Sequence, residues 1–115
     1  SCRADRARER AEQLASQRLA AAEATIDPLL EGGRKAEAAA VFDAFTAVPE
    51  HRGTRALTRA WRGWGERLRR AGDLDVARAA IAQAYASAGD PASEREILGE
   101  LARLFDEQWS YDQLA

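Results

Sequence analysis

The chain has 115 residues, of which 46% are hydrophobic and 31% are charged, and its formal net charge is −2. This balance is typical of one folded domain with a modest core, and it excludes a disordered chain. The charge offers no positive field to a nucleic-acid backbone, and no run of about eighteen apolar residues is present to span a membrane. Alanine, the strongest helix former, occurs 27 times, and strand-like alternation is missing, so the expected fold class is all-α.

The first residues bear on the location of the protein. Cys2 is the only cysteine, which excludes an internal disulfide and a multi-cysteine metal site. A Ser-Cys start fits an exported lipoprotein whose cysteine carries lipid, but an arbitrary chain boundary in a cytoplasmic protein is the simpler interpretation. The enrichment in arginine and alanine, with Lys35 as the single lysine, indicates a GC-rich bacterial genome.

A long amphipathic helix is predicted for residues 3–25, where apolar side chains recur at three- and four-residue steps. Asp27 and Pro28 then resemble an N-cap followed by proline at the first helical position, which predicts a break and a short new segment. Gly32 and Gly33 are expected to end that segment.

Four further helices are predicted, each with its own start or stop signal. Residues 34–47 form the first of them, and Thr54 is the expected N-cap of the next. Gly72 and Asp73 end that helix and start the following one, and Asp90, with proline after it, starts the last. The apolar stripes of the four helices are Ala38, Val41, Phe42 and Phe45; Leu57, Trp61, Trp64 and Leu68; Val76, Ala77, Ala80, Ile81 and Ala84; and Ile97, Leu98, Leu101, Leu104 and Phe105.

Ser110 and Gln113 stand at the spacing of a capping box, in which two side chains bond to each other's backbone N–H groups. This pattern predicts that the preceding helix has ended and that a new helix begins at Ser110. Because only two residues follow Gln113, we expect the natural polypeptide to continue beyond this sequence.

Two sets of residues recur along the chain at nearly constant spacing, which is the mark of a repeat architecture. Gly33, Ala38 and Phe42 are matched 39 residues later by Gly72, Ala77 and Ile81. A second set is matched 37 residues later: Trp61, Trp64, Gly65 and Leu68 correspond to Leu98, Leu101, Ala102 and Phe105. The recurring positions are glycine, small or apolar in both copies, so the repetition concerns helix packing.

The pattern W-x-x-W-G-x-x-L at residues 61–68, followed by Ala77, Ile81 and Pro91, resembles the signature of the tetratricopeptide (TPR) repeat family. It departs from the family in a period longer than about 34 residues and in a tryptophan at the usual leucine. The resemblance implies a right-handed solenoid of stacked antiparallel helical hairpins, preceded by the long N-terminal helix.

The resemblance also implies an organisation and a core. The N-terminal helix and its connector take residues 1–31, and residues 32–115 hold the repeats, as a partial unit (33–53), a near-complete unit (54–91) and a partial unit (92–115). The residues expected to pack in the repeat core are Phe42, Trp61, Trp64, Gly65, Leu68, Ala77, Ile81, Leu98, Leu101, Ala102 and Phe105.

No residue pattern typical of an active site is found in the sequence. His51 is the only histidine, and it is expected at the surface of a turn, without a partner at motif spacing. There is no glycine-rich phosphate loop, nucleophile motif or metal-ligand pattern. The sequence therefore predicts no enzymatic activity, no cofactor and no metal, and any activity would lie in sequence outside this chain.

The best candidate for a binding feature is a group of arginines on the tryptophan-bearing helix: Arg55, Arg59, Arg62, Arg69 and Arg70. In arrays that this chain resembles, the first helix of each pair lines a concave groove, where arginines could pair with carboxylates of a partner. A solvated helix face is the competing interpretation. The corresponding face of the next helix carries Glu96, Glu100, Arg103 and Glu107, so a groove of mixed charge is predicted.

The expected function is that of a non-catalytic scaffold segment that binds a peptide or protein partner, of acidic character if the arginines take part. Substituting Arg59 and Arg62 by glutamate is then expected to weaken binding without lowering the melting temperature. Two alternatives stay open. The alanine-rich first helix could mediate self-association, in an oligomerisation or spacer element, or the chain could be the sensor or regulatory segment of a larger bacterial kinase, ATPase or transcription regulator.

Overall fold

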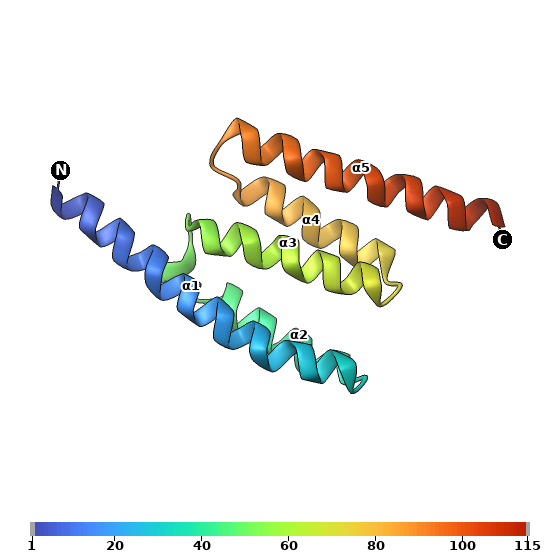
Figure 1. The fold of residues 1–115 in the computed structure, drawn as a ribbon, viewed down its shortest axis with the longest axis horizontal. Helices are drawn as coiled ribbons and strands as arrows, with labels where there is room; N and C mark the ends of the chain where they lie inside the picture. Colours follow the sequence, from blue (N-terminus) through green and yellow to red (C-terminus); the bar gives the residue numbers. More distant parts are fainter. Residues whose placement is uncertain (1, 115) are drawn as a thin grey trace. The chain divides into compact units, whose positions relative to one another are not determined.

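The computed structural model describes residues 2–114, and within that range the chain forms five α-helices and one short 3₁₀ helix, without a strand (Figure 1). The elements are α1 (Cys2–Glu31), α2 (Lys35–Thr46), η1 (Pro49–His51), α3 (Arg55–Arg70), α4 (Leu74–Ser87) and α5 (Pro91–Leu114). The all-α fold class predicted from the alanine content is therefore confirmed. None of the described helices is long and apolar enough to cross a membrane.

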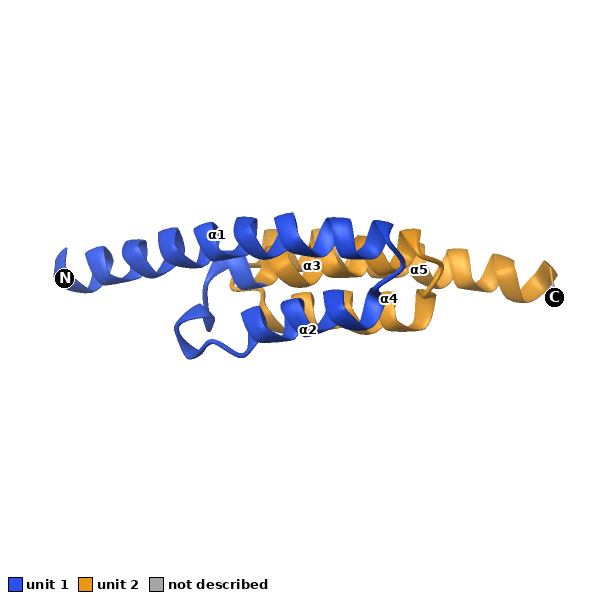
Figure 2. Cartoon of the chain, turned by 90° about the horizontal axis from the view of Figure 1, so that it is seen from below, with its two compact units in different colours: residues 1–57 blue, residues 58–115 orange. Residues whose placement is uncertain are grey.

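The chain divides into two compact units, residues 1–57 and 58–115, shown in two colours in Figure 2. The boundary falls in the first turn of α3. The first unit contains α1, α2 and η1, with α2 packed along α1, and the second contains most of α3 together with α4 and α5, which pack on each other.

The connections α1–α2 and α3–α4 are the same tight turn, built around a glycine. Gly33 and Gly72 have φ angles of +74° and +86°, in the left-handed region where glycine is favoured because it has no Cβ. In the first turn the N–H of Arg34 donates to the carbonyl of Leu29 at 2.8 Å, and the equivalent bond in the second turn is 3.0 Å long. This six-residue closure is the Schellman motif. The two glycines that recur in the sequence thus occupy equivalent backbone positions.

The predicted N-caps of α3 and α5 are confirmed by their hydrogen bonds. The hydroxyl oxygen of Thr54 accepts the backbone N–H of Leu57 at 3.2 Å. Asp90 accepts the backbone N–H of Ser93 at 2.8 Å on one carboxylate oxygen and the Ser93 hydroxyl at 2.8 Å on the other. Both caps satisfy an N–H group that has no partner inside its helix.

The predicted break at Asp27 and Pro28 is wrong, because α1 continues through Pro28 to Glu31. Proline cannot donate to the carbonyl four residues earlier, which normally weakens a helix interior. Here only the last turn follows Pro28, and Ile26 beside it is buried. One lost hydrogen bond near the helix end is therefore outweighed by packing and by the turn at Gly33.

The predicted helix start at Ser110 is also wrong. Helix α5 runs without interruption to Leu114, and the hydroxyl of Ser110 donates to the carbonyl of Asp106 at 3.1 Å, inside the same helix. A capping box requires the chain to leave the helical conformation just before it. No glycine or proline between Leu101 and Ser110 provides such an exit, so the helix propagates through the motif.

The core of the first unit lies between α1 and α2. Ala15, Leu19 and Ile26 of α1 are buried, as are Ala38, Phe42 and Phe45 of α2. These positions follow the three- and four-residue steps predicted from the sequence. Burial of a large aliphatic or aromatic side chain contributes about 1.5–3 kcal/mol, so these few side chains account for much of the stability of the unit.

His51 was expected at the surface, but only 1% of it is exposed. Its Nδ1 lies 2.7 Å from the carbonyl oxygen of Phe45, and its Nε2 lies 3.3 Å from a guanidinium nitrogen of Arg18. A guanidinium can only donate, so Nε2 accepts and the proton sits on Nδ1, which donates to Phe45. The imidazole also packs on the Phe45 ring, with centroids 4.2 Å apart. His51 therefore connects α1, α2 and η1, and its role is structural.

The core of the second unit includes Trp64, Leu68, Ala77, Ile81, Ala84, Ile97 and Leu104. Helices α3 and α4 approach each other closely at Gly65, where a Cβ atom would lie 2.5 Å from Cδ1 of Ile81. This is the packing reason for the glycine in the W-G motif.

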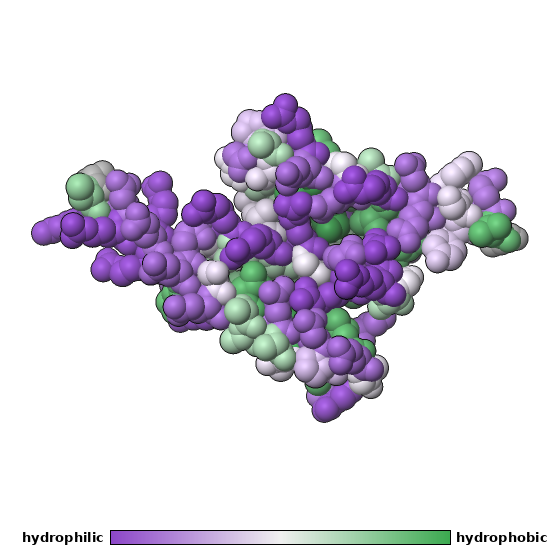
Figure 3. Space-filling model, viewed as in Figure 1, coloured by the Kyte–Doolittle hydropathy of each residue, from purple (hydrophilic) through white to green (hydrophobic). Residues whose placement is uncertain are grey.

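In Figure 3 the visible surface is mostly hydrophilic, with apolar side chains in separate patches.

The structure differs from the expected repeat core in α5. Leu98, Ala102 and Phe105 are exposed, and Leu101, like Trp61 on α3, is only partly buried. The buried positions of α5 are instead Ile97 and Leu104, seven residues apart on the side that packs on α4. On the other side of α5, Leu98 and Phe105 are about half exposed, and the guanidinium of Arg78 from α4 lies over the Phe105 ring, 4.7 Å from its centroid.

Candidate functional site

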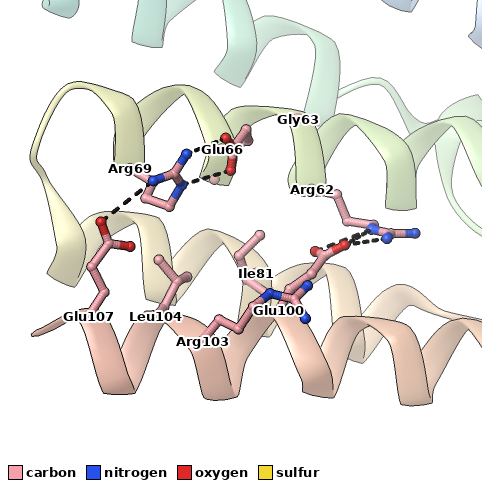
Figure 4. A pocket seen from close by; sticks show the side chains of 10 residues that line it. Arg62, Gly63, Glu66, Arg69, Ile81, Glu100, Arg103, Leu104 and Glu107 are labelled. Carbon is pink, nitrogen blue, oxygen red and sulfur yellow. Dashed lines mark hydrogen bonds and ion pairs between the residues drawn. The ribbon is translucent and has the colours of Figure 1, made fainter. Parts of the chain in front are cut away.

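A groove of about 540 Å³ lies between α3 and α5 in the second unit (Figure 4). Gly65, Ile81 and Leu104 form its apolar floor. Charged side chains from the two helices form its rims: Arg62, Glu66 and Arg69 from α3, and Glu100, Arg103 and Glu107 from α5. The groove thus combines an apolar base with polar edges, which is the usual composition of a binding site.

The first of two ion-pair bridges across the groove joins Arg62 to α5. The Nε of Arg62 donates to Oε1 of Glu100 at 3.0 Å, and a second guanidinium nitrogen bonds to the same oxygen. A third nitrogen lies 3.5 Å from Glu96. The hydrogen bond to Glu100, helped by the negative charge of both carboxylates, raises the pKa of Arg62 despite partial desolvation. Arg62 is therefore held by its own chain.

The second bridge joins Arg69 to two carboxylates. Arg69 donates to both oxygens of Glu66 at 2.9 and 2.7 Å, and it reaches Glu107 of α5 at 3.5 Å. The hydrogen bond between Arg69 and Glu66 is the main cause of two pKa shifts: the pKa of Arg69 is raised and the pKa of Glu66 is lowered. Arg70 adds a further ion pair to Glu66 at 3.2 Å. Such bidentate pairs are the better-oriented class of surface ion pair.

The two bridges share one spacing. Arg62 pairs with Glu100 and Arg69 with Glu107, so each arginine meets a glutamate 38 residues later. Seven residues are two helical turns, and the equal offset shows that α3 and α5 run in the same direction along the groove. Paired charges thus recur at matching steps along the two rims.

Arg103 lies between the two bridges and is not part of either. It is exposed and lines the groove, yet no carboxylate of the described residues lies within ion-pair distance of it. The 38-residue offset explains this, because the position opposite Arg103 is Gly65. The glycine that admits Ile81 of α4 thus also leaves Arg103 without a side chain opposite it.

The structure gathers only part of the predicted arginine group. Arg62 and Arg69 line the groove, and Arg70 joins them through Glu66. Arg55 belongs to the first unit, where its backbone N–H donates to Glu12 at 2.7 Å and its guanidinium lies 3.8 Å from the same carboxylate. Arg59 is exposed and does not line the groove.

The groove carries three arginines and three glutamates, and so has the mixed charge that the sequence indicates. The sequence does not single out Arg103, which stands there as one of four charges on its helix face, with Glu96, Glu100 and Glu107. The available signal was the register of the helices: with Arg62 opposite Glu100, the residue opposite Arg103 has to be Gly65. Recognising this requires knowing which helices are neighbours.

The described residues contain no group of three or more His, Cys, Asp or Glu side chains that could hold a metal ion. What the groove offers chemically is a guanidinium beside an apolar floor.

When the chain is compared with protein-family models, with curated proteins and with solved structures, no match is found. Its function has to be inferred from its own residues.

Proposed function

We propose that the chain is a non-catalytic, TPR-like interaction module, and that the groove between α3 and α5 binds an extended segment of a partner protein. The observation that carries this proposal is Arg103, a guanidinium without an internal partner beside the apolar surface of Ile81 and Leu104. The TPR-like architecture is supported by the equivalent turns at Gly33 and Gly72 and by the close helix approach at Gly65.

The chemistry of the groove suggests which segment fits. An aliphatic side chain of the partner would lie on the floor formed by Ile81 and Leu104, and an adjacent carboxylate would pair with Arg103. The other groove arginines, Arg62 and Arg69, are already engaged by glutamates of the chain. The groove therefore selects one acidic group next to an apolar residue, and not a run of acidic residues.

The test uses a displayed library of extended peptides in which one Asp or Glu adjoins one Leu or Ile. Peptides selected by the native chain should bind Arg103→Glu about tenfold or more weakly, because a hydrogen bond to a charged group contributes about 1.5–3 kcal/mol. The matched control is Arg95→Glu, the same charge change at another exposed arginine of α5 that does not line the groove.

Titration calorimetry of the native chain and both variants measures the three affinities. Equal affinity of the selected peptides for the native chain and for Arg103→Glu, or a library that yields no binder, would refute the proposal. A loss that is equally large in Arg95→Glu would also count against it, because it would reflect the net charge of α5 and not the groove.

Self-association through α1, the alternative left open by the sequence, has less support. Three apolar residues of its stripe, Ala15, Leu19 and Ile26, are already buried within the first unit. Of the larger apolar side chains of α1, Leu14 is the exposed one. A single leucine is a small area beside the about 800 Å² per partner that a stable interface buries.

A further inference from the structure

The groove between α3 and α5 contains a second incompletely paired charge, the carboxylate of Glu107. Its one ion-pair contact among the described residues is a guanidinium nitrogen of Arg69 at 3.5 Å (Figure 4). Arg69 already donates to both carboxylate oxygens of Glu66, at 2.9 and 2.7 Å. Glu107 can therefore turn to another cation without leaving Arg69 unpaired.

The other two glutamates of the groove are held more closely. Glu66 is bound by Arg69 as described, and Glu100 accepts Nε of Arg62 at 3.0 Å together with a second nitrogen of the same guanidinium. Glu107 has a side chain that is 35% exposed and a single long contact. It is thus the carboxylate of the groove that is most available to a ligand, as Arg103 is the most available cation.

Arg103 and Glu107 lie four residues apart on α5, and both line the groove. They do not form an ion pair with each other, and an arginine placed four residues before a glutamate is the weaker order for a helix pair. Four residues correspond to about 6 Å along the helix axis. In an extended chain, side chains two positions apart point to the same side and lie about 6.6 Å apart. The two spacings match.

We propose that the groove recognises a three-residue pattern in its partner, in which one acidic and one basic residue flank an aliphatic residue. The acidic side chain pairs with Arg103 and the basic side chain with Glu107. The aliphatic side chain between them points to the other side of the extended segment, onto Gly65 and Ile81, where the glycine leaves room for it. This inference rests on the proposed function and adds the second charge of the ligand and its position.

The charge balance of the groove favours a ligand with one charge of each sign. Three arginines and three glutamates line the groove, so their formal charges cancel. A segment with two acidic residues at this spacing would place one carboxylate beside Glu107, and a segment with two basic residues would place one cation beside Arg103. Each of these like-charge contacts is unfavourable, so the mixed charge of the groove acts against both kinds of segment.

The probes are capped peptides in which Glu-Leu-Lys, Glu-Leu-Gln or Glu-Leu-Glu stands between two Gly-Ser pairs. Each is made in both sequence directions, because the two charges define the order of the contacts along the groove and not the direction of the peptide backbone. In the direction that binds Glu-Leu-Lys more tightly, calorimetric titration should rank the lysine peptide first, the glutamine peptide second and the glutamate peptide last. The first and last should differ about threefold or more, because an exposed ion pair changes affinity by up to about fivefold.

A fourth peptide tests the spacing. In Glu-Leu-Ser-Lys the lysine is three positions from the glutamate, so in an extended segment it points away from the α5 rim. This peptide should bind like Glu-Leu-Gln and not like Glu-Leu-Lys.

One protein variant should invert the ranking. In Glu107→Lys the new ammonium group attracts the final glutamate of Glu-Leu-Glu and repels the lysine of Glu-Leu-Lys. The matched control is Asp106→Lys, the same charge change at the neighbouring exposed carboxylate, which does not line the groove. This control should keep the native ranking. Circular dichroism of each variant confirms that the helices are retained.

The inference is overturned if the three peptides bind the native chain equally, if Glu-Leu-Ser-Lys binds as tightly as Glu-Leu-Lys, or if Glu107→Lys keeps the native ranking. An inversion that also occurs in Asp106→Lys overturns it as well, because the net charge of α5 would then be the cause. The proposed function is judged separately by Glu-Leu-Gln, whose single charge meets only Arg103. If this peptide binds the native chain and loses affinity in Arg103→Glu, the groove is supported even where the lysine adds nothing. If none of the peptides binds, both proposals are overturned.

Discussion

His51 in the first unit and the two ion-pair bridges in the second unit show two ways of tying helices together with polar groups. His51 is buried, and both of its ring nitrogens have partners in its own unit. The bridges of Arg62 and Arg69 are partly exposed, with roughly a third of each arginine side chain open to solvent. A buried polar contact becomes costly once one partner is removed, whereas an exposed pair can be replaced by water. Removal of His51 should therefore destabilise the first unit more than removal of either bridge destabilises the second.

The largest effect is expected from His51→Ala. The change leaves the carbonyl of Phe45 without its hydrogen bond and removes the ring that packs on Phe45, at a combined cost of about 3 kcal/mol in the free energy of unfolding. Urea unfolding followed by circular dichroism measures this loss. His51→Asn, whose amide can still donate to a carbonyl, should recover part of it. A loss below about 1 kcal/mol would show that His51 does not join the elements of the first unit.

The second unit should respond most strongly at Gly65. Gly65→Ala places a Cβ 2.5 Å from Ile81 and 3.2 Å from the carbonyl oxygen of Ala77, and overpacking of this kind costs about 1–3 kcal/mol, partly offset by about 1 kcal/mol of helix propensity. We expect a net loss of up to about 2 kcal/mol, reduced when Ile81→Val is added. Gly99→Ala is the matched control.

At Gly99 the nearest side-chain atom to an added Cβ is a guanidinium nitrogen of Arg103 at 3.7 Å, so Gly99→Ala should stabilise the chain by up to about 1 kcal/mol. The two glycine substitutions should thus have opposite signs in the same unfolding experiment. The same sign for both would mean that Gly65 has no special packing role, and that the close approach of α3 and α4 does not control the second unit.

The bridges should contribute less than either of these sites. Arg62→Glu places a carboxylate beside Glu100 and Glu96, and we expect a loss of about 1 kcal/mol that shrinks in high salt. This corrects the expectation that glutamate at Arg59 and Arg62 leaves the melting temperature unchanged, which would hold only if Arg62 were a free surface charge. Thermal melts at low and high salt measure the effect. If Arg62→Glu lowers the free energy of unfolding as much as His51→Ala does, the buried contact of the first unit and the exposed bridges of the second do not differ in their contribution to stability.

These contrasts show how far the sequence could predict the structure. The turn glycines, the caps at Thr54 and Asp90, and most of the cores of α2 and α4 depend on local patterns, and these predictions agree with the structure. The prediction of Val76 in the core of α4 is wrong, because this residue is 53% exposed. The break at Pro28 and the start at Ser110 were also local signals, but the surrounding helix overrode both of them. Local signals fail where a neighbouring segment determines whether the helix continues.

The candidate site was less predictable, for a physical reason. Whether an arginine is engaged depends on which residue of another helix lies opposite: Glu100 lies opposite Arg62, whereas Gly65 lies opposite Arg103. The burial of His51 similarly depends on Arg18, 33 residues away. Sequence periodicity shows which face of a helix is apolar, but it does not show which helix faces it.

The smallest expected effect on stability concerns the N-cap of α5. This cap lies at the surface, so its contribution should be smaller than that of the buried contact at His51. The hydrogen bonds from the backbone and hydroxyl of Ser93 lower the pKa of Asp90 below its ordinary value of 3.8. The ionised form is thus favoured in the folded chain, so the cap's contribution is complete above pH 3.8 and is lost as the pH falls through the lower folded pKa. Asp90→Ser keeps a capping oxygen that does not titrate in this range. The difference in urea midpoint between the native chain and Asp90→Ser should therefore change between pH 5 and pH 2, in favour of the variant at the lower pH. A difference that stays constant over that range would show that the charge of Asp90 plays no part in the cap.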